Sequence, residues 1–192
     1  MIENDHRPIF LVGAPASGKT TFGRALARAL GKEFIDLDKY IENRFHTTVN
    51  ALFDTRGEEG FRQMERSMLQ EAGCFEDVVV ACGGGTPCFH GNMEWMNANG
   101  TTVWLQTTPR RIVERLMINR SRRPMFRSLG REEVEAKVAS LLATREPFYS
   151  HAAILFPGEE LENAREIDRS VQSFLKGHCG RQAVPGRCPE KG

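Results

Sequence analysis

The stretch that decides the fold is Gly13-Ala14-Pro15-Ala16-Ser17-Gly18-Lys19-Thr20, because it fits the pattern G-x-x-x-x-G-K-[ST] of a phosphate-binding loop. The apolar run Ile9–Val12 precedes it and predicts a buried strand, and apolar residues at helical spacing follow it from Phe22 to Leu30. Between a strand and a helix, backbone N–H groups and the positive end of the helix dipole converge on an anion. A glycine-rich turn without a ligand is the alternative, but such a turn does not require a Lys-Thr pair.

The same loop predicts how a nucleotide would be held. Lys19 is placed to reach the β- and γ-phosphates, and the Thr20 hydroxyl is placed to bind Mg²⁺. The other nucleotide contacts are expected from the loop and the first helical turn, namely Gly13, Ala16, Ser17, Gly18 and Thr21.

Length and charge limit the possible partners. The chain has 192 residues and a formal net charge of +1, which suits one domain and predicts neither a nucleic-acid groove nor a membrane-surface patch. No apolar stretch approaches the roughly 18 residues of a transmembrane helix, and the polar segment Met1–Arg7 is unlike a secretory signal. We therefore expect no nucleic-acid partner, no membrane association and a monomer.

The cysteine pattern favours a reducing compartment. The five cysteines are odd in number and form no C-x-x-C pair, so neither a disulfide framework nor a zinc site is expected, and a cytoplasmic location fits. Cys82 follows the apolar run Val78–Ala81 and adjoins three glycines. A reactive thiol is conceivable there, but a small packing residue is favoured.

Strand-like and helix-like segments alternate along the chain, which predicts an α/β fold with parallel strands joined by helical crossovers. The strands are expected near residues 8–12, 33–37, 78–81, 102–105 and 154–156. The helices are expected near 19–30, 39–45, 49–56, 58–71, 92–99, 109–118, 131–145 and 164–175. We therefore expect one domain over residues 1–176. The segment 177–192 is aperiodic and rich in Gly, Pro, Arg and Cys, and we expect it to be a disordered tail.

Two aspartates lie at the end of the second predicted strand. Because ligands bind beyond the carboxyl ends of parallel strands, and because strand alternation would let residues at i and i+2 face the same side, both Asp36 and Asp38 could face the cleft. Asp36 would then contribute to the Mg²⁺ shell, and Asp38 would accept a hydrogen bond from a substrate hydroxyl. The alternative is that Asp38 only caps the next helix.

Three further features are candidates for ligand binding. Gly83-Gly84-Gly85 ends the third strand, where three glycines favour a close backbone approach to a ligand over a simple turn. Arg62 and Arg145 lie on predicted helices and are either ligand-binding or ordinary surface arginines. The basic loop 119–124 contains Arg120, Arg122 and Arg123 and ends in proline, so it is either a lid that closes over ATP or an exposed loop.

Together these residues resemble the shikimate kinase family, relatives of the nucleoside monophosphate kinases. The matching elements keep the family's order and approximate spacing from Pro8 to Phe156: Gly13–Thr20, Phe34–Asp38, Leu52-Phe53, Gly57-Glu58, Phe61-Arg62 with Glu65, Gly83–Gly85, Arg123-Pro124 and Arg145–Tyr149. The resemblance implies a three-layer P-loop NTPase fold, with a five-stranded parallel sheet, a substrate-binding helical segment and a lid over about 119–131. It also implies ATP-dependent phosphorylation of the 3-hydroxyl of shikimate in aromatic amino-acid biosynthesis, with ATP and Mg²⁺ as cofactors.

The resemblance further implies a role for each site residue. Asp38 would bind the shikimate hydroxyls and orient the attacking oxygen, and Arg62 and Arg145 would bind the carboxylate. The glycines Gly83, Gly84 and Gly85 would present their backbone to the ring hydroxyls, while Phe53 and Phe61 would pack against the ring. With Lys19 and Asp38, Arg123 completes the expected catalytic set as the lid arginine that reaches the phosphates.

The chain departs from the family pattern at a few positions. Cys82 replaces a small hydroxyl residue, and Met125-Phe126 follows Pro124 where leucines are usual. No arginine for the adenine is evident between the last strand and the last helix, in Gly158–Asn163. A related small-molecule kinase, such as a gluconate kinase, and a nucleotide-binding regulatory domain without catalysis are the competing interpretations, and retention of the whole polar set argues against the second.

Overall fold

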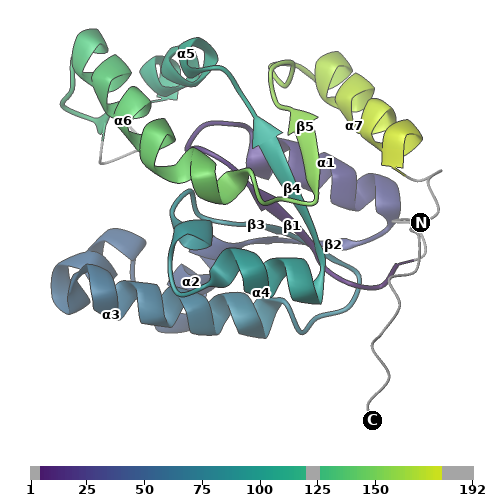
Figure 1. Ribbon diagram of the computed structural model, residues 1–192, viewed down its shortest axis with the longest axis horizontal. Coiled ribbons are helices and arrows are strands. Elements are labelled where there is room, and N and C mark those ends of the chain that lie inside the picture. The colour runs from purple at the N-terminus through teal and green to yellow at the C-terminus, as the bar shows by residue number, and fades with distance from the viewer. Residues whose placement is uncertain (1–4, 120–125, 179–192) are drawn as a thin grey trace.

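The computed structural model describes residues 5–119 and 126–178. Its centre is a five-stranded sheet in which every neighbouring pair is parallel, in the order β2-β3-β1-β4-β5. The strands are β1 (Ile9–Val12), β2 (Glu33–Asp36), β3 (Val78–Ala81), β4 (Thr101–Gln106) and β5 (Ile154–Pro157). Figure 1 shows these strands between two layers of helices, so the predicted three-layer α/β architecture is confirmed.

The helices alternate with the strands along the chain. They are α1 (Lys19–Leu30), α2 (Leu37–Phe45), α3 (Val49–Ala72), the short 3-10 helix η2 (Thr86–Cys88), α4 (Asn92–Asn99), α5 (Pro109–Asn119), α6 (Arg131–Tyr149) and α7 (Ala164–His178). Among these described helices, none is long and apolar enough to span a membrane. The three cysteines within the described ranges, Cys74, Cys82 and Cys88, are free thiols.

Strand β1 shows how the sequence produces the layers. All four of its residues are fully buried, and successive side chains point to opposite faces. Ile9 and Leu11 belong to a core cluster with α1 and α7, whereas Phe10 and Val12 belong to a cluster with α2, α3 and α4. Burial on both faces explains the continuous apolar run, which is typical of central parallel strands.

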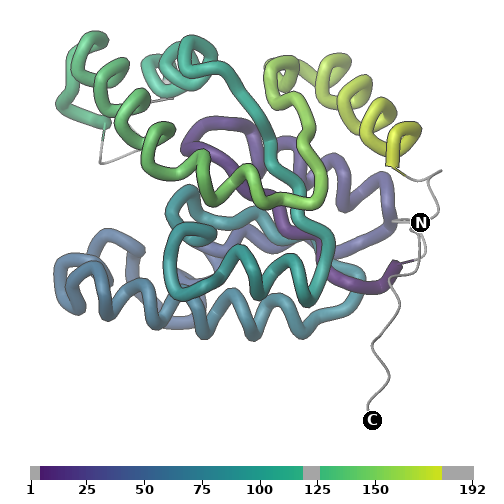
Figure 2. The backbone as a smooth tube through the Cα atoms, viewed as in Figure 1, coloured from purple at the N-terminus to yellow at the C-terminus, as the bar shows by residue number. Residues whose placement is uncertain are grey.

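A third cluster joins α5 and α6 beneath the phosphate-binding loop. It includes Ala14 of the loop, Leu116 of α5, Phe126, and Val138 and Leu142 of α6. In Figures 1 and 2 the helix pair α5–α6 lies at the upper left and α3 at the lower left, while the C-terminal turn of α6 packs through Tyr149 in the same core cluster as α3. The carboxyl ends of the central strands therefore open between these two groups of helices.

Most predicted element boundaries hold within one or two residues, and α1, β3 and α4 match their predicted ranges. The segments expected at 49–56 and 58–71 form one helix, α3, with a non-helical break at Gly57. The prediction that the next-to-last helix ends at Arg145 was wrong, because α6 continues through Pro147 to Tyr149. A proline so close to a helix end removes only one hydrogen-bond donor, and Ser150 N still donates to Glu146 O at 2.9 Å.

The C-terminal tail begins later than predicted. The tail was expected to start at Gly177, but Gly177 and His178 belong to α7. The remaining tail residues, 179–192, lie outside the described residues.

Cys82 is buried in the cluster with α4, where its Sγ lies 3.7 Å from Met96 Sδ. Burial raises the pKa of this thiol, which favours the packing role over a reactive thiol.

The break at Gly57 generates a stability prediction. Gly57 has φ 69° and ψ 176°, a conformation that is essentially restricted to glycine. We expect Gly57→Ala to cost about 1–3 kcal/mol and to lower Tm by about 5 °C. Gly177→Ala is the matched control, because both glycines face open space but Gly177 has helical geometry. Equal Tm values for Gly57→Ala and wild type in a thermal melt would contradict the strain argument.

Candidate active site

The phosphate-binding loop folds back on its own lysine. Lys19 is 9% exposed, and its Nζ donates to Gly13 O at 2.8 Å and to Ala14 O at 2.7 Å. Gly18 has the left-handed conformation, with φ 98°, immediately before α1 begins at Lys19. The loop thus holds a cationic group over the first turn of a helix, where backbone N–H groups favour an anion.

The predicted metal ligands meet at the start of α1 and α2. Thr20 Oγ1 donates to Asp36 Oδ2 at 3.0 Å. Asp36 Oδ1 also accepts from Lys39 N at 3.4 Å, so Asp36, not Asp38, caps the N-terminus of α2. Among the described residues no cluster of three or more His, Cys, Asp or Glu side chains forms a metal site. A hydroxyl and one carboxylate suit Mg²⁺ in phosphoryl-transfer enzymes, where substrate phosphates and water complete the shell.

Asp38 is positioned by a helix, and the argument from strand alternation was wrong. β2 ends at Asp36, and Asp38 lies in the first turn of α2. Its carboxylate nevertheless faces the glycine triplet, because a Cβ built on Gly83 would lie 3.1 Å from Asp38 Oδ1 and 3.1 Å from Glu65 Oε1. The turn at the strand end, rather than the pleat, brings Asp38 to the carboxyl edge.

The surroundings of Asp38 raise the pKa of its carboxyl group. Its side chain is exposed to solvent, yet the protein around it and the nearby carboxylates of Asp36 and Glu65 raise its pKa to about 6, while Lys19 opposes the shift. A carboxylate near this pKa is ionised at neutral pH and retains some basicity toward a substrate hydroxyl.

Arg62 is held by a buried ion pair. Its Nη1 donates to Glu65 Oε2 at 2.7 Å, and both side chains are buried. Glu65 also accepts a hydrogen bond from the buried hydroxyl of Thr86. The guanidinium stacks on Phe89 at 4.2 Å, and its Nε is buried without a hydrogen-bond partner among the described residues. An unsatisfied buried donor is costly, so it points to a ligand or water at this position.

The glycine triplet brings the predicted acceptor residues together. A Cβ on Gly85 would lie 2.6 Å from Arg62 Nη2, and a Cβ on Gly84 would lie 3.1 Å from Arg145 Nη1 and 3.0 Å from Pro15 Cδ. Together with the contact between Gly83 and Asp38, these approaches surround the triplet with one carboxylate, two guanidinium groups and the phosphate-binding loop. The triplet is therefore the meeting point of residues that are up to 130 positions apart in the sequence, and side chains on it would obstruct that meeting.

Two aromatic residues form a wall beside Arg62. Phe53 and Phe61 stack with ring centroids 4.1 Å apart, and the Arg62 guanidinium lies 5.4 Å from each ring. Phe53 precedes the break at Gly57 and Phe61 follows it, so the break folds one ring back over the other. Such a wall offers an apolar face next to a carboxylate-binding arginine.

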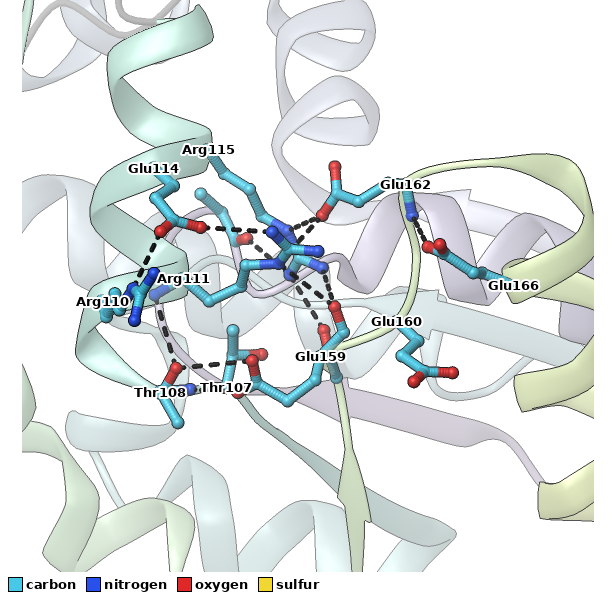
Figure 3. A network of polar contacts seen from close by, with 12 residues as sticks. Thr107, Thr108, Arg110, Arg111, Glu114, Arg115, Glu159, Glu160, Glu162 and Glu166 are labelled. Carbon is cyan, nitrogen blue, oxygen red and sulfur yellow. Dashed lines mark hydrogen bonds and ion pairs between the residues drawn. The ribbon is translucent and has the colours of Figure 1, made fainter.

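A network of polar contacts joins the start of α5 to the segment 159–166, as Figure 3 shows. Arg115 of α5 donates to Gly158 O at 2.9 Å and to Glu159 O at 2.9 Å, and it pairs with Glu162 at 2.7 Å. The same guanidinium lies within 3.3 Å of the Ala16 and Ser17 carbonyl oxygens. Arg115 of α5 thus joins the segment 158–163 to the phosphate-binding loop, a contact that sequence reasoning did not predict.

A cavity of about 480 Å³ lies beside this network, and it is lined by Thr108, Arg110, Arg111, Glu114, Glu159 and Glu160. Arg111, which lines the cavity, lies one helical turn before Arg115 on α5, and Arg115 contacts the loop. The position of the cavity next to the phosphate-binding loop makes it a candidate for the base and ribose end of a nucleotide.

The expected lid, over about 119–131, lies partly outside the described residues. Arg123, together with Arg120 and Arg122, falls in the segment 120–125 that the structure does not describe. Phe126 follows directly and is buried between α5 and α6.

The comparisons with known proteins fit this geometry. The sequence profile described as "Shikimate kinase" matches residues 15–176. The chain belongs to the shikimate kinase family. A shikimate kinase of Phocaeicola vulgatus is 50% identical over 168 residues, which are 88% of this chain and 96% of that protein.

Two solved shikimate kinases extend the comparison to structure. The crystal structure of the Bacteroides thetaiotaomicron enzyme matches with a TM-score of 0.87 and 46% identity, over 88% of this chain and 97% of that one. The Acinetobacter baumannii enzyme, solved in complex with shikimate, matches with a TM-score of 0.76 and 33% identity, over 88% and 91% of the two chains. Membership of a kinase family means that the chain is an ATP-using enzyme, which rules out the non-catalytic regulatory domain.

The raised pKa of Asp38 generates a prediction about stability. An unfolded aspartate ionises near pH 3.8 and Asp38 only near 6, so the folded protein loses stability relative to the unfolded chain as pH rises through this window. We expect Asp38→Asn to raise Tm by about 2 °C at pH 7.5 and to leave it nearly unchanged at pH 4, while it abolishes turnover.

The control for this prediction is Asp168→Asn, an exposed carboxylate on α7, which should show no such pH dependence. Thermal melts at both pH values measure the difference. If Asp38→Asn were no more stable than wild type at pH 7.5, the proposed electrostatic strain at Asp38 would be refuted.

Proposed function

We propose that this chain transfers the γ-phosphoryl group of ATP to the 3-hydroxyl of shikimate, giving shikimate 3-phosphate and ADP, a step of aromatic amino-acid biosynthesis. The observation that carries the proposal is the ring of groups around Gly83–Gly85, where Asp38, Arg62 and Arg145 face a backbone that is also in contact with the phosphate-binding loop. Family membership supports the same reaction. A small ring acid with several hydroxyls matches two arginines, one carboxylate and exposed main chain.

The acceptor would be bound mainly through its carboxylate. Arg62 is fixed by Glu65, and its buried Nε has no hydrogen-bond partner among the described residues, which suits an incoming carboxylate. Arg145 would bind the same carboxylate from the other side of Gly84. The stacked rings of Phe53 and Phe61 would cover the apolar face of the ring, and the backbone of Gly84 with its neighbours would face its hydroxyls.

The phosphoryl-transfer step would depend on positioning and charge. Asp38 would accept a hydrogen bond from the 3-hydroxyl and hold its oxygen in line with the γ-phosphoryl group. Lys19 would leave the loop carbonyls to bind the β- and γ-phosphates, where its charge stabilises the transferring group. Arg123, by the family resemblance, would add a second positive charge from the lid.

The nucleotide would bind to the loop through Gly13, Ala16, Ser17, Gly18, Thr20 and Thr21. Mg²⁺ would be held by Thr20 directly and by Asp36, and it would neutralise phosphate charge. The Thr20–Asp36 hydrogen bond already brings these two oxygens together. We also propose a cytoplasmic monomer, supported by the cysteine pattern and the balanced charge of the sequence.

A coupled ADP-release assay with a panel of acceptors tests the proposed function. Shikimate should be phosphorylated far faster than gluconate, which has no carbocycle for the ring wall, and than nucleoside monophosphates, which have no carboxylate for the arginine pair. Quinate, which is also a ring acid, is the most stringent competitor, and shikimate should be preferred over it. A preference for gluconate would instead support a related small-molecule kinase, and it would refute the proposal.

The role of Lys19 predicts a loss of catalytic rate. We expect Lys19→Met, which keeps most of the buried side-chain length, to lower kcat by about 10³-fold or more, since a charge on the transferring group is removed. Lys176→Ala on α7 is the control, because this exposed lysine lies far along a different helix. Near-normal kcat for Lys19→Met, with circular dichroism showing a folded protein, would exclude the assigned role.

The role of Arg62 predicts a selective loss of acceptor affinity. Arg62→Ala would leave Glu65 as a buried unpaired charge and unsettle the fold, so Arg62→Lys is the better variant. It keeps the charge but loses the planar fork, and KM for shikimate should rise by about 10–100-fold while KM for ATP changes less than about twofold. Arg44→Lys, an exposed arginine on α2, is the control. Equal increases in both KM values would remove Arg62 from the acceptor site.

A further inference from the structure

Tyr149 is a buried phenol that reaches across the molecule. It is the last residue of α6, it is 0% exposed, and its hydroxyl donates to the carbonyl oxygen of Gly84, 65 residues earlier in the chain. The C-terminal end of α6 and the loop after β3 are thereby joined, and Figure 2 lets the reader follow both backbone segments. A buried hydroxyl requires a hydrogen-bond partner, and the partner of this one is the Gly84 carbonyl of the glycine triplet.

The ring that carries this hydroxyl is fixed by the core. Tyr149 belongs to the cluster that contains Phe10, Val12 and Leu37, and its ring lies 5.9 Å from that of Trp104 on β4. Close packing leaves such a ring little rotamer freedom. The phenolic oxygen is therefore a fixed point against which a loop can be held.

The backbone of the glycine triplet requires fixed hydrogen-bond partners to hold one conformation. Glycine is the residue with the greatest backbone freedom, and three in succession would leave the loop poorly defined. Gly83 O accepts from Thr86 N at 3.1 Å, and Gly85 O accepts from Cys88 N at 2.9 Å, both within the local turn. The Gly84 carbonyl is held by Tyr149, from another part of the fold.

Gly84 also lies close to Arg145 and to the phosphate-binding loop. Arg145 Nη1 and Pro15 Cδ would lie 3.1 Å and 3.0 Å from a Cβ on Gly84. Arg145 is one helical turn before Tyr149 on the same helix, so α6 holds both the arginine and the carbonyl. The distance between the arginine and the glycine backbone is then set by a single rigid element.

We propose that Tyr149 is a positioning residue of the acceptor site, which fixes the Gly84–Gly85 peptide relative to Arg145 through its hydrogen bond to the Gly84 carbonyl. The proposal rests on the proposed function, because it takes the triplet and Arg145 to bind the acceptor. Burial also raises the pKa of the phenol, so Tyr149 stays protonated and donates throughout the pH range of an assay.

Loss of the hydroxyl would release one peptide plane. In Tyr149→Phe the ring remains in the core, but the Gly84 carbonyl loses its donor and the Gly84–Gly85 peptide can rotate. The backbone offered to the ring hydroxyls would then be displaced relative to Arg145. Small misplacements of this kind weaken binding and catalysis without removing any group that touches the substrate.

The test is steady-state kinetics and calorimetric shikimate binding on Tyr149→Phe. We expect KM and Kd for shikimate to rise by about tenfold, as for the loss of one well-placed hydrogen bond, with KM for ATP changed less than about twofold. Tyr40→Phe is the matched control, since Tyr40 is the chain's other tyrosine and its hydroxyl donates to Glu71 Oε1 at 2.6 Å on α3, away from the triplet. It should leave both KM values unchanged, even if Tm falls.

The outcomes separate this proposal from the proposed function. If wild type phosphorylates shikimate and Tyr149→Phe raises both KM values equally or neither, Tyr149 has only a structural role and the positioning proposal is wrong. If wild type does not phosphorylate shikimate, the proposed function itself fails. Should Tyr149→Phe be unstable, the same comparison is made at a temperature where circular dichroism shows it fully folded.

Discussion

The buried ion pair between Arg62 and Glu65 is the constraint on which the acceptor side of the site depends. A guanidinium taken out of water is tolerated only when it is paired and hydrogen-bonded, and breaking such a pair costs about 3–5 kcal/mol. Glu65 satisfies one nitrogen of Arg62 and also accepts from Thr86 next to the glycine triplet. The pair thereby ties α3 to the loop after β3, and it leaves Arg62 Nε directed toward no partner among the described residues.

The same region concentrates negative charge. Asp36, Asp38 and Glu65 approach one another, and their repulsion is offset by Lys19 and Arg62. Desolvation of the Asp38 carboxylate, together with the repulsion from Asp36 and Glu65, raises its pKa to about 6. Such electrostatic strain is expected where chemistry, rather than stability, decides which residues are kept. Stability and reactivity therefore make opposite demands on Asp38.

The sequence predicted those parts of the site that are encoded locally. The phosphate-binding loop, the bounds of α1 and the break at Gly57 all follow from short patterns of glycine and apolar residues, and the structure agrees with them. The pair Asp36-Asp38 was assigned to a strand because nothing in the local pattern shows where a strand turns into a helix. The hydrogen bond from Lys39 N to Asp36, which starts α2, decides that point.

Other contributions depend on tertiary packing, which no short pattern contains. α5 offers Arg110, Arg111 and Arg115, and only its packing against α6 determines that Arg115 reaches the carbonyl oxygens of the phosphate-binding loop. Glu65 lies at i+3 from Arg62, a spacing that suggests a helical ion pair but not its burial.

Helix α6 shows how separate parts of the site can be coordinated. Its buried residues Val134, Val138 and Leu142 pack in the cluster that contains Phe126 and Ala14, whereas its C-terminal turn carries Arg145 and Tyr149. One rigid helix thus contacts Phe126 within the expected lid segment, the phosphate-binding loop and the glycine triplet. A displacement of α6 at its lid end would be transmitted along the helix to Arg145 and to the Gly84 carbonyl, because a packed helix moves as a unit. If the nucleotide and the acceptor bind as proposed, α6 contacts both sites, and the hydrogen bond between Tyr149 and Gly84 is one contact through which they would be linked.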